Sequence, residues 1–131
     1  MKPVSIENQE LVVAQFGKWP AFHDAEIVSV LFERAEPGFW PVISLRIYAR
    51  ARPGAAAPAT HCLVELQFAG VREYQLEGFN HQNVVFSLTF EQEGELVSCA
   101  IEPSYGLYGY IAAERVMVKS VSILNGNPQQ P

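Results

Sequence analysis

Hydrophobic residues follow two different spacings along this chain. Over residues 8–17 they recur at the separations of one helical face. From Ile27 onward, apolar and polar residues alternate, which is typical of strands that bury one face. The pattern therefore predicts a short N-terminal helix over 8–17 and an antiparallel sheet over 27–123.

The predicted helix carries its own start and stop signals. Asn8 suits the N-cap, and Gly17 follows as the residue that most readily takes the left-handed backbone of a helix end. Leu11, Val12 and Phe16 share one face of the helix. We expect this face to be buried.

The alternating region divides into strands at turn-forming residues. The segment 42–50 alternates most cleanly, with Ile43, Leu45 and Ile47 on one face. Residues 51–60 are small and rich in alanine and proline, which predicts a flexible hairpin tip. The predicted strands are residues 27–34, 42–50, 61–68, 71–76, 83–91, 96–101 and 110–123.

Two of these strands carry further expectations. In the fifth strand, Val84, Phe86, Leu88 and Phe90 recur at every second position, so we expect them on a single face. Residues 71–76 alternate only weakly, which predicts a separate strand at an edge of the sheet.

The order of elements indicates the fold class. Turns at 36–38 and 91–95 link strands directly, and the chain shows no internal repeat and no β-α-β rhythm. We predict one domain over 1–131, of the α+β class and mostly β, in which one short helix packs on a strongly bent antiparallel sheet of six or seven strands. A two-sheet β-sandwich is the alternative, and residues 125–131 are predicted to form a frayed tail.

Composition narrows the classes of function. The 131 residues are 49% hydrophobic and 18% charged, so the chain can bury a core. Its net charge of −5 argues against nucleic-acid or anionic-membrane binding, because both require basic surface. No apolar run approaches the ~20 residues that span a bilayer.

Cys62 and Cys99 lie within apolar alternations, which predicts buried free thiols and a cytoplasmic protein.

The densest group of chemically active side chains lies just before the first predicted strand. Trp19, Phe22, His23, Asp24 and Glu26 fall there in one short stretch. Three interpretations stay open: a structural joint, a partner-binding surface, or the site of a small hydrolase-like enzyme that uses His23 with Asp24 or Glu26. On an extended strand, His23 and Asp24 point to opposite faces, which argues against a direct catalytic pair.

Two further clusters lie later in the chain. Residues 77–83 are rich in side-chain amides, which can hold a loop together or recognise a partner. Residues 105–110 hold three tyrosines, which suit both strand faces and interfaces. The candidate partner-binding residues of all three clusters are Trp19, Phe22, His23, Asp24, Glu26, Asn80, His81, Gln82, Tyr105 and Tyr108.

Ligand spacing indicates no metal site. His61 and Cys62 are adjacent and face oppositely on a predicted strand, and His81 lies further along the chain. A small-ligand-binding domain that uses these residues is a further alternative. We expect neither a metal nor a cofactor.

Four stretches in a fixed order resemble a known family. They are residues 19–26 (Trp-Pro-Ala-Phe-His-Asp-Ala-Glu), 68–71 (Phe-Ala-Gly-Val), 78–84 (Gly-Phe-Asn-His-Gln-Asn-Val) and 105–106 (Tyr-Gly). This order resembles the immunity protein 50 family, small bacterial proteins predicted to neutralise toxins of polymorphic toxin systems. The first and third stretches are the most specific.

The resemblance implies a cytosolic inhibitor without catalytic activity that binds one cognate protein toxin. An acidic chain would suit a basic toxin, because complementary charge raises the association rate. In the alanine-rich stretch 51–60, this chain departs from the pattern of the family. A homodimer formed through an exposed strand edge stays open.

Overall fold

The computed structural model describes residues 4–34 and 38–124, in one helix and six strands. The predicted tail 125–131 lies outside the described residues, and so does most of the predicted turn at 36–38. The one helix within the described ranges has seven residues and is not long and apolar enough to cross a membrane. The elements are α1 (Glu10–Phe16), β1 (Glu26–Arg34), β2 (Pro41–Ala51), β3 (Thr60–Glu77), β4 (Val84–Glu93), β5 (Leu96–Tyr105) and β6 (Tyr108–Leu124).

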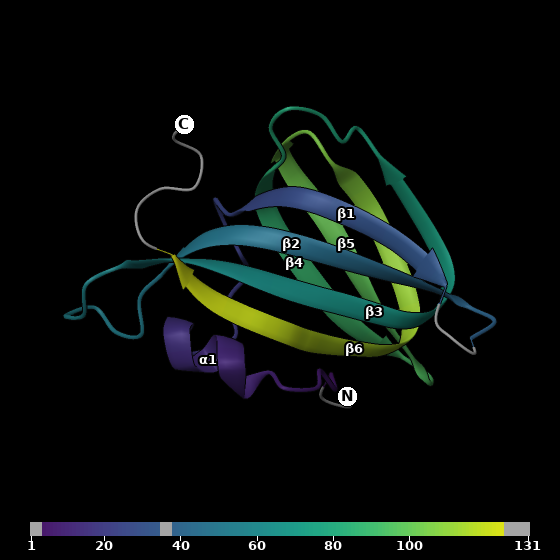
Figure 1. Ribbon diagram of the computed structural model, residues 1–131, viewed down its shortest axis with the longest axis horizontal. Coiled ribbons are helices and arrows are strands. Elements are labelled where there is room, and N and C mark those ends of the chain that lie inside the picture. The colour runs from purple at the N-terminus through teal and green to yellow at the C-terminus, as the bar shows by residue number, and fades with distance from the viewer. Residues whose placement is uncertain (1–3, 35–37, 125–131) are drawn as a thin grey trace.

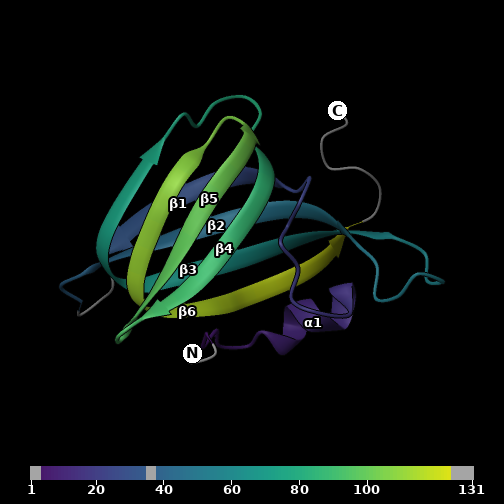
Figure 2. The same cartoon turned by 180° about the vertical axis from the view of Figure 1, so that it is seen from behind.

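The strands form a closed antiparallel barrel in the order β1-β2-β3-β6-β5-β4. Figure 1 shows β1, β2, β3 and β6 in front of β4 and β5, with α1 beside β6. Figure 2 shows the same barrel from behind, with the connection from α1 running across to the start of β1. The mostly-β prediction with one short helix is confirmed, and the strands form a ring rather than two separate sheets.

Two long strands carry the bend of the sheet. β3 and β6 pair from His61↔Leu124 to Glu77↔Tyr108, with a register shift between Val71 and Glu73. The prediction of two separate strands over 61–68 and 71–76 was therefore wrong, because both segments form one continuous strand that pairs with β6. The second segment lies at an edge as expected, since β2 pairs with β3 only between Thr60 and Phe68. Gly70 lies at this bend with a φ of 67°, where a Cβ would come 2.3 Å from Glu114 Oε1.

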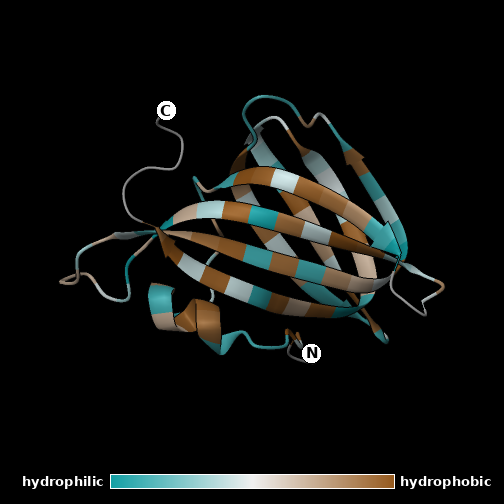
Figure 3. Ribbon diagram, in the orientation of Figure 1, coloured by the Kyte–Doolittle hydropathy of each residue, from teal (hydrophilic) through white to brown (hydrophobic). Residues whose placement is uncertain are grey.

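The barrel interior follows the predicted alternation in most strands. Ile43, Leu45 and Ile47 of β2 face inward and are fully buried. Figure 3 shows hydrophobic and hydrophilic residues alternating along the front strands. The largest fully buried side chains are Phe68, Ile27, Ile43, Leu45, Ile47, Leu66, Ile111, Val12, Val64, Val71, Val85 and Val116.

The predicted face of β4 is wrong at its start. The pairing of β4 with β5 shifts register at Val84/Val85 and again at Val85/Ser87. These β-bulges change which side chains point inward, so that Val85 is 1% exposed and Phe86 is 52% exposed. Leu88, beyond the bulges, is buried as expected.

The helix is shorter than its sequence signals suggest. Asn8 does not cap it: its backbone has a φ of 60°, and its side-chain amide donates to the Val118 carbonyl oxygen at 3.3 Å. The N-cap is Gln9, which makes no side-chain capping bond. Val12 is fully buried, whereas Leu11, expected on the buried face, is exposed.

The segment before the helix is tied to β6. Glu7 forms a parallel bridge with Met117, and its carboxylate accepts two hydrogen bonds from the Arg115 guanidinium at 2.8 and 2.9 Å. This hydrogen-bonded cation lowers the pKa of Glu7 below its ordinary value of 4.5. The pair therefore stabilises the folded chain only while Glu7 is ionised.

We expect a pH-dependent effect of Arg115→Gln. Since the folded-state pKa of Glu7 is lowered, its contribution is complete above pH 4.5 and disappears as the pH falls through the folded value. Urea unfolding of both proteins should show a difference in unfolding free energy at pH 7 that shrinks toward pH 3. A difference that stays constant over this range would show that the ion pair is not its source.

Leu66→Ala tests the core of the barrel. Leu66 is fully buried, so its truncation should lower the unfolding free energy by about 2–5 kcal/mol. Leu31→Ala is the matched control, because Leu31 is 52% exposed in β1. Equal losses for the two variants in urea unfolding would contradict the assigned faces.

Candidate functional site

The stretch between α1 and β1 forms a sharp corner. Phe22 and Asp24 adopt left-handed backbone conformations, with φ of 61° and 68°, and the Ala25 N–H donates to the Phe22 carbonyl oxygen at 3.0 Å. This turn brings His23 Nδ1 to 3.3 Å from Asp24 Oδ2. The prediction that His23 and Asp24 face apart was therefore wrong, because the backbone there is not extended.

The His23–Asp24 pair lies on the surface. The two side chains are 57% and 77% exposed, and the His23 ring meets the Phe86 ring edge-on at 5.3 Å between centroids. Water weakens electrostatic interactions between groups as exposed as these. The pair is thus placed to meet a binding partner or a substrate, and it is not enclosed by protein.

The aromatic residues of the corner face the other way, into the core. Phe22 is 2% exposed and meets Phe16 and Trp19 edge-on, at 5.6 and 5.8 Å between ring centroids. Trp19 meets Phe90 in the same manner at 5.7 Å, and its buried Nε1 has no hydrogen-bond partner among the described residues. Phe22 therefore belongs to the core and not to the surface that a partner can touch.

Backbone hydrogen bonds from the corner close the barrel onto β4. The Asp24 N–H donates to the Val85 carbonyl oxygen at 2.9 Å, and the Val85 N–H donates to the Ala25 carbonyl oxygen at 2.8 Å. Leu88 N–H donates to the Ala21 carbonyl oxygen at 2.9 Å. Strand pairing between β1 and β4 is limited to Glu26↔Val84, so the corner supplies most of the closure.

One buried amide ties the corner to two loops. Asn83 is 4% exposed, and its Nδ2 donates to the carbonyl oxygens of Ile27 at 3.2 Å and Asn80 at 3.0 Å. Its Oδ1 accepts the N–H groups of Asn80 at 3.0 Å and Leu107 at 3.1 Å. All four bonding positions of the side-chain amide are thereby used, joining β1, the loop before β4 and the turn after β5.

The loop between β3 and β4 is held by its own amides. Asn80 Nδ2 donates to the Gly78 carbonyl oxygen at 2.9 Å, and Asn80 Oδ1 accepts the Gln82 N–H at 3.2 Å. The His81 ring lies 6.0 Å from the Tyr105 ring, edge-on. These contacts order the loop without strand pairing.

Eight of the ten predicted partner-binding residues gather where residues 21–27 join the ring of strands to β4, which we call the closed end of the barrel. Glu26 pairs with Val84, which pairs in turn with Tyr105 on the next strand. Trp19 and Phe22 lie beneath them and support the corner. We name the remaining set the corner surface: His23, Asp24, Glu26, Asn80, His81, Gln82, Tyr105 and Tyr108.

A groove of about 530 Å³ lies beside the corner and was not foreseen from the sequence. One wall is the corner itself, and the other is the end of β2 with Ala59 of the hairpin tip. Lys18 comes from the first wall, and Tyr48, Arg50 and Arg52 come from the second. Because these segments lie far apart in the sequence, no motif or residue spacing could have indicated that they meet.

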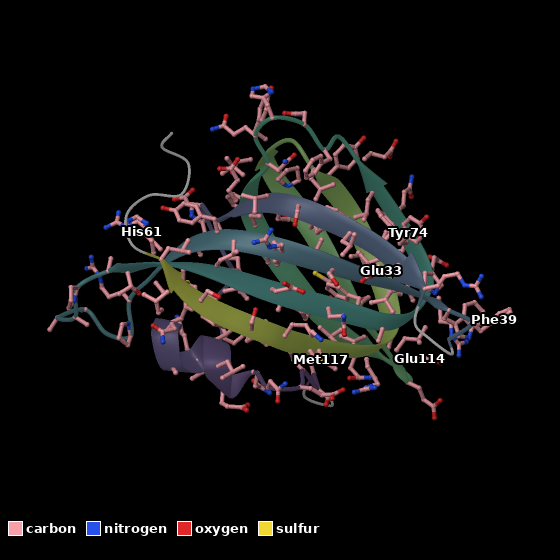
Figure 4. The ribbon with its side chains drawn as sticks, in the orientation of Figure 1. Glu33, Phe39, His61, Tyr74, Glu114 and Met117 are labelled. Atoms are coloured by element: carbon pink, nitrogen blue, oxygen red, sulfur yellow. The ribbon has the colours of Figure 1, made fainter. Side chains whose placement is uncertain are left out.

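A second exposed cluster lies at the far end of the barrel. Phe32 contacts Tyr74 and Phe39 contacts Trp40, at 5.3 and 5.2 Å between ring centroids, while the Arg72 guanidinium lies 4.3 Å from the centre of the Trp40 ring. Figure 4 shows Phe39 and Tyr74 at the end opposite His61. We call these five residues the aromatic cluster; no sequence pattern pointed to it.

Metal-ligating residues do not assemble in the described part of the chain. No group of three His, Cys, Asp or Glu residues there could hold a metal ion. His61 Nδ1 instead shares a hydrogen bond with the Tyr48 hydroxyl. Burial raises the pKa of the Cys62 and Cys99 thiols, which disfavours the reactive thiolate form.

Comparison with known families matches residues 8–124 to the family described as Immunity protein 50. The chain belongs to the immunity protein 50 family. Comparisons with curated proteins and with solved structures found no match. In this immunity protein 50 chain, three of the four stretches that carried the resemblance, 19–26, 78–84 and 105–106, meet around Asn83.

Asn83→Ala should destabilise this member of the family. It leaves the Ile27 carbonyl and the Leu107 N–H without their partner, and buried unpaired groups cost about 1–3 kcal/mol each. We expect urea unfolding to show a loss of about 2–4 kcal/mol. Asn80→Ala is the control, because Asn80 is exposed and its loss should cost clearly less. Equal effects would contradict the role given to Asn83.

Proposed function

We propose that this chain is a cytoplasmic immunity protein that binds a cognate toxin of a polymorphic toxin system and neutralises it without catalysis. The family match over residues 8–124 carries the proposal. We expect the cognate toxin to be a protein that is encoded next to this chain. Inhibition by binding requires a stable scaffold and a complementary surface, and it requires no chemistry from the inhibitor.

The corner surface is the contact that we propose for the toxin. Its loops are fixed by Asn83 and Asn80, so little conformational freedom is lost when a partner binds. Tyr105 and Tyr108 are about half exposed and offer large contact areas with few rotatable bonds. His23, Asp24 and the Phe86 ring extend the same surface toward the corner.

A hydrolase-like activity is the second candidate function. The observation that favours it is the 3.3 Å contact between His23 and Asp24 beside the groove, since a carboxylate next to an imidazole is a common acid–base arrangement. Two features weigh against it. The pair is highly exposed, and in the described chain no hydrogen bond joins it to a serine hydroxyl.

Co-expression tests the proposed function. We expect this chain to restore growth to cells that produce the toxic C-terminal domain encoded beside it, and to form a complex of equal stoichiometry with that domain. His23→Ala removes the imidazole of the exposed pair. If the chain acts by binding alone, this variant should protect cells to the extent that it still forms the complex.

The outcomes separate the two candidates. Loss of protection by His23→Ala while the complex still forms would indicate catalysis rather than binding. Absence of both complex and protection, with folded protein, would exclude the immunity function. Light scattering of the isolated chain in the same series reports whether it also forms the homodimer that the sequence left open.

A further inference from the structure

The groove beside the corner combines an apolar floor with a charged rim. Its floor and walls include five alanines, three of them buried, which leave room for a side chain to enter. Its rim carries Lys18, Arg50 and Arg52, all exposed. The five alanines are Ala21, Ala25, Ala49, Ala51 and Ala59.

The rim is positive although the chain as a whole is acidic. Three of the chain's nine lysine and arginine residues line this groove, against the single carboxylate of Asp24. Within the described residues, none of these three cations forms an ion pair, whereas Arg72 and Arg115 are each paired with a glutamate. The groove thus presents an excess of positive charge on a chain of net charge −5.

One wall of the groove is already fixed in place. The Tyr48 ring stacks on the His61 ring with 5.7 Å between centroids, and the Tyr48 hydroxyl is hydrogen-bonded to His61 Nδ1. On the opposite wall, Phe22 is held by its ring contacts in the core. At the end of α1, Gly17 approaches the hairpin tip so closely that a Cβ would lie 2.2 Å from the Pro53 carbonyl oxygen. A preformed groove loses little entropy on binding.

We propose that this groove receives an acidic segment of the cognate toxin. Carboxylates of that segment lie between Lys18, Arg50 and Arg52, and one of its apolar side chains rests on the alanine floor. Arginine suits such a contact because its planar guanidinium can bind a carboxylate through two parallel hydrogen bonds. This inference rests on the proposed function. The acidic composition of the chain suggested a basic toxin, and the groove requires that this toxin also carries an acidic segment.

Charge reversal in the groove is the direct test. The probe is a catalytically inactive form of the neighbouring toxin domain, and binding is followed by stopped-flow and by titration calorimetry. Lys18→Glu combined with Arg50→Glu and Arg52→Glu should weaken binding by about 100-fold or more, since like charges would then face each other. The affinity of the wild type for the toxin domain should fall with added salt, and this dependence should change in the variant.

A control with the same change in net charge is available. Arg34, Arg46 and Lys119 are also exposed and form no ion pair in the described chain, but they do not line the groove. Their triple replacement by glutamate should leave affinity within a fewfold of the wild type. Equal weakening by the two triple variants would overturn the groove as the contact, because net charge alone would then explain the effect.

A second pair of variants keeps the test valid if charge reversal disturbs folding. Ala59→Trp fills the groove and should block binding, whereas Ala56→Trp places the same side chain on the same hairpin tip outside the groove and should not. Toxin binding by Ala59→Trp at wild-type affinity would overturn the inference. If the wild type itself fails to bind the toxin domain, the proposed function fails, and this outcome is distinct from a failure confined to the groove variants.

Discussion

The side-chain amide of Asn83 is the contact on which the closed end of this fold depends. It is buried, and it joins the start of β1, the loop before β4 and the turn after β5 through four hydrogen bonds. Strand pairing between β1 and β4 is a single residue pair, so closure relies on this amide and on backbone bonds from residues 21–27. Buried polar groups that are fully satisfied in this way favour one arrangement of the chain over others.

This closure also explains the conformation of the corner. To reach β4 with its backbone, the chain turns sharply at Phe22 and Asp24, both with positive φ, a conformation that costs free energy for residues other than glycine. The same turn places Phe22 in the core and leaves His23 and Asp24 outside. One backbone feature therefore both seals the barrel and builds the surface that we propose for toxin binding.

The sequence predicted the regular parts of this fold well and the irregular parts poorly. Period-two alternation placed Ile43, Leu45 and Ile47 in the core, because β2 has regular pairing along its inner face. The same rule failed at Phe86, where two register shifts rotate the strand, and at Gly70, where a bend was taken for a break. The amide-rich loop and the corner were identified as tied structures or interfaces. The groove was missed because Lys18 and Arg50 come together only through the fold.

The corner surface and the groove lie side by side, since His23 and Asp24 belong to both, whereas the aromatic cluster lies at the opposite end of the barrel. Hydrogen–deuterium exchange of the chain, alone and with the inactive toxin domain, tests this placement most directly. We predict slower exchange in the complex over residues 18–26, 48–52 and 78–83. Slower exchange confined to residues 38–40 and 72–74, at the aromatic cluster, would contradict it.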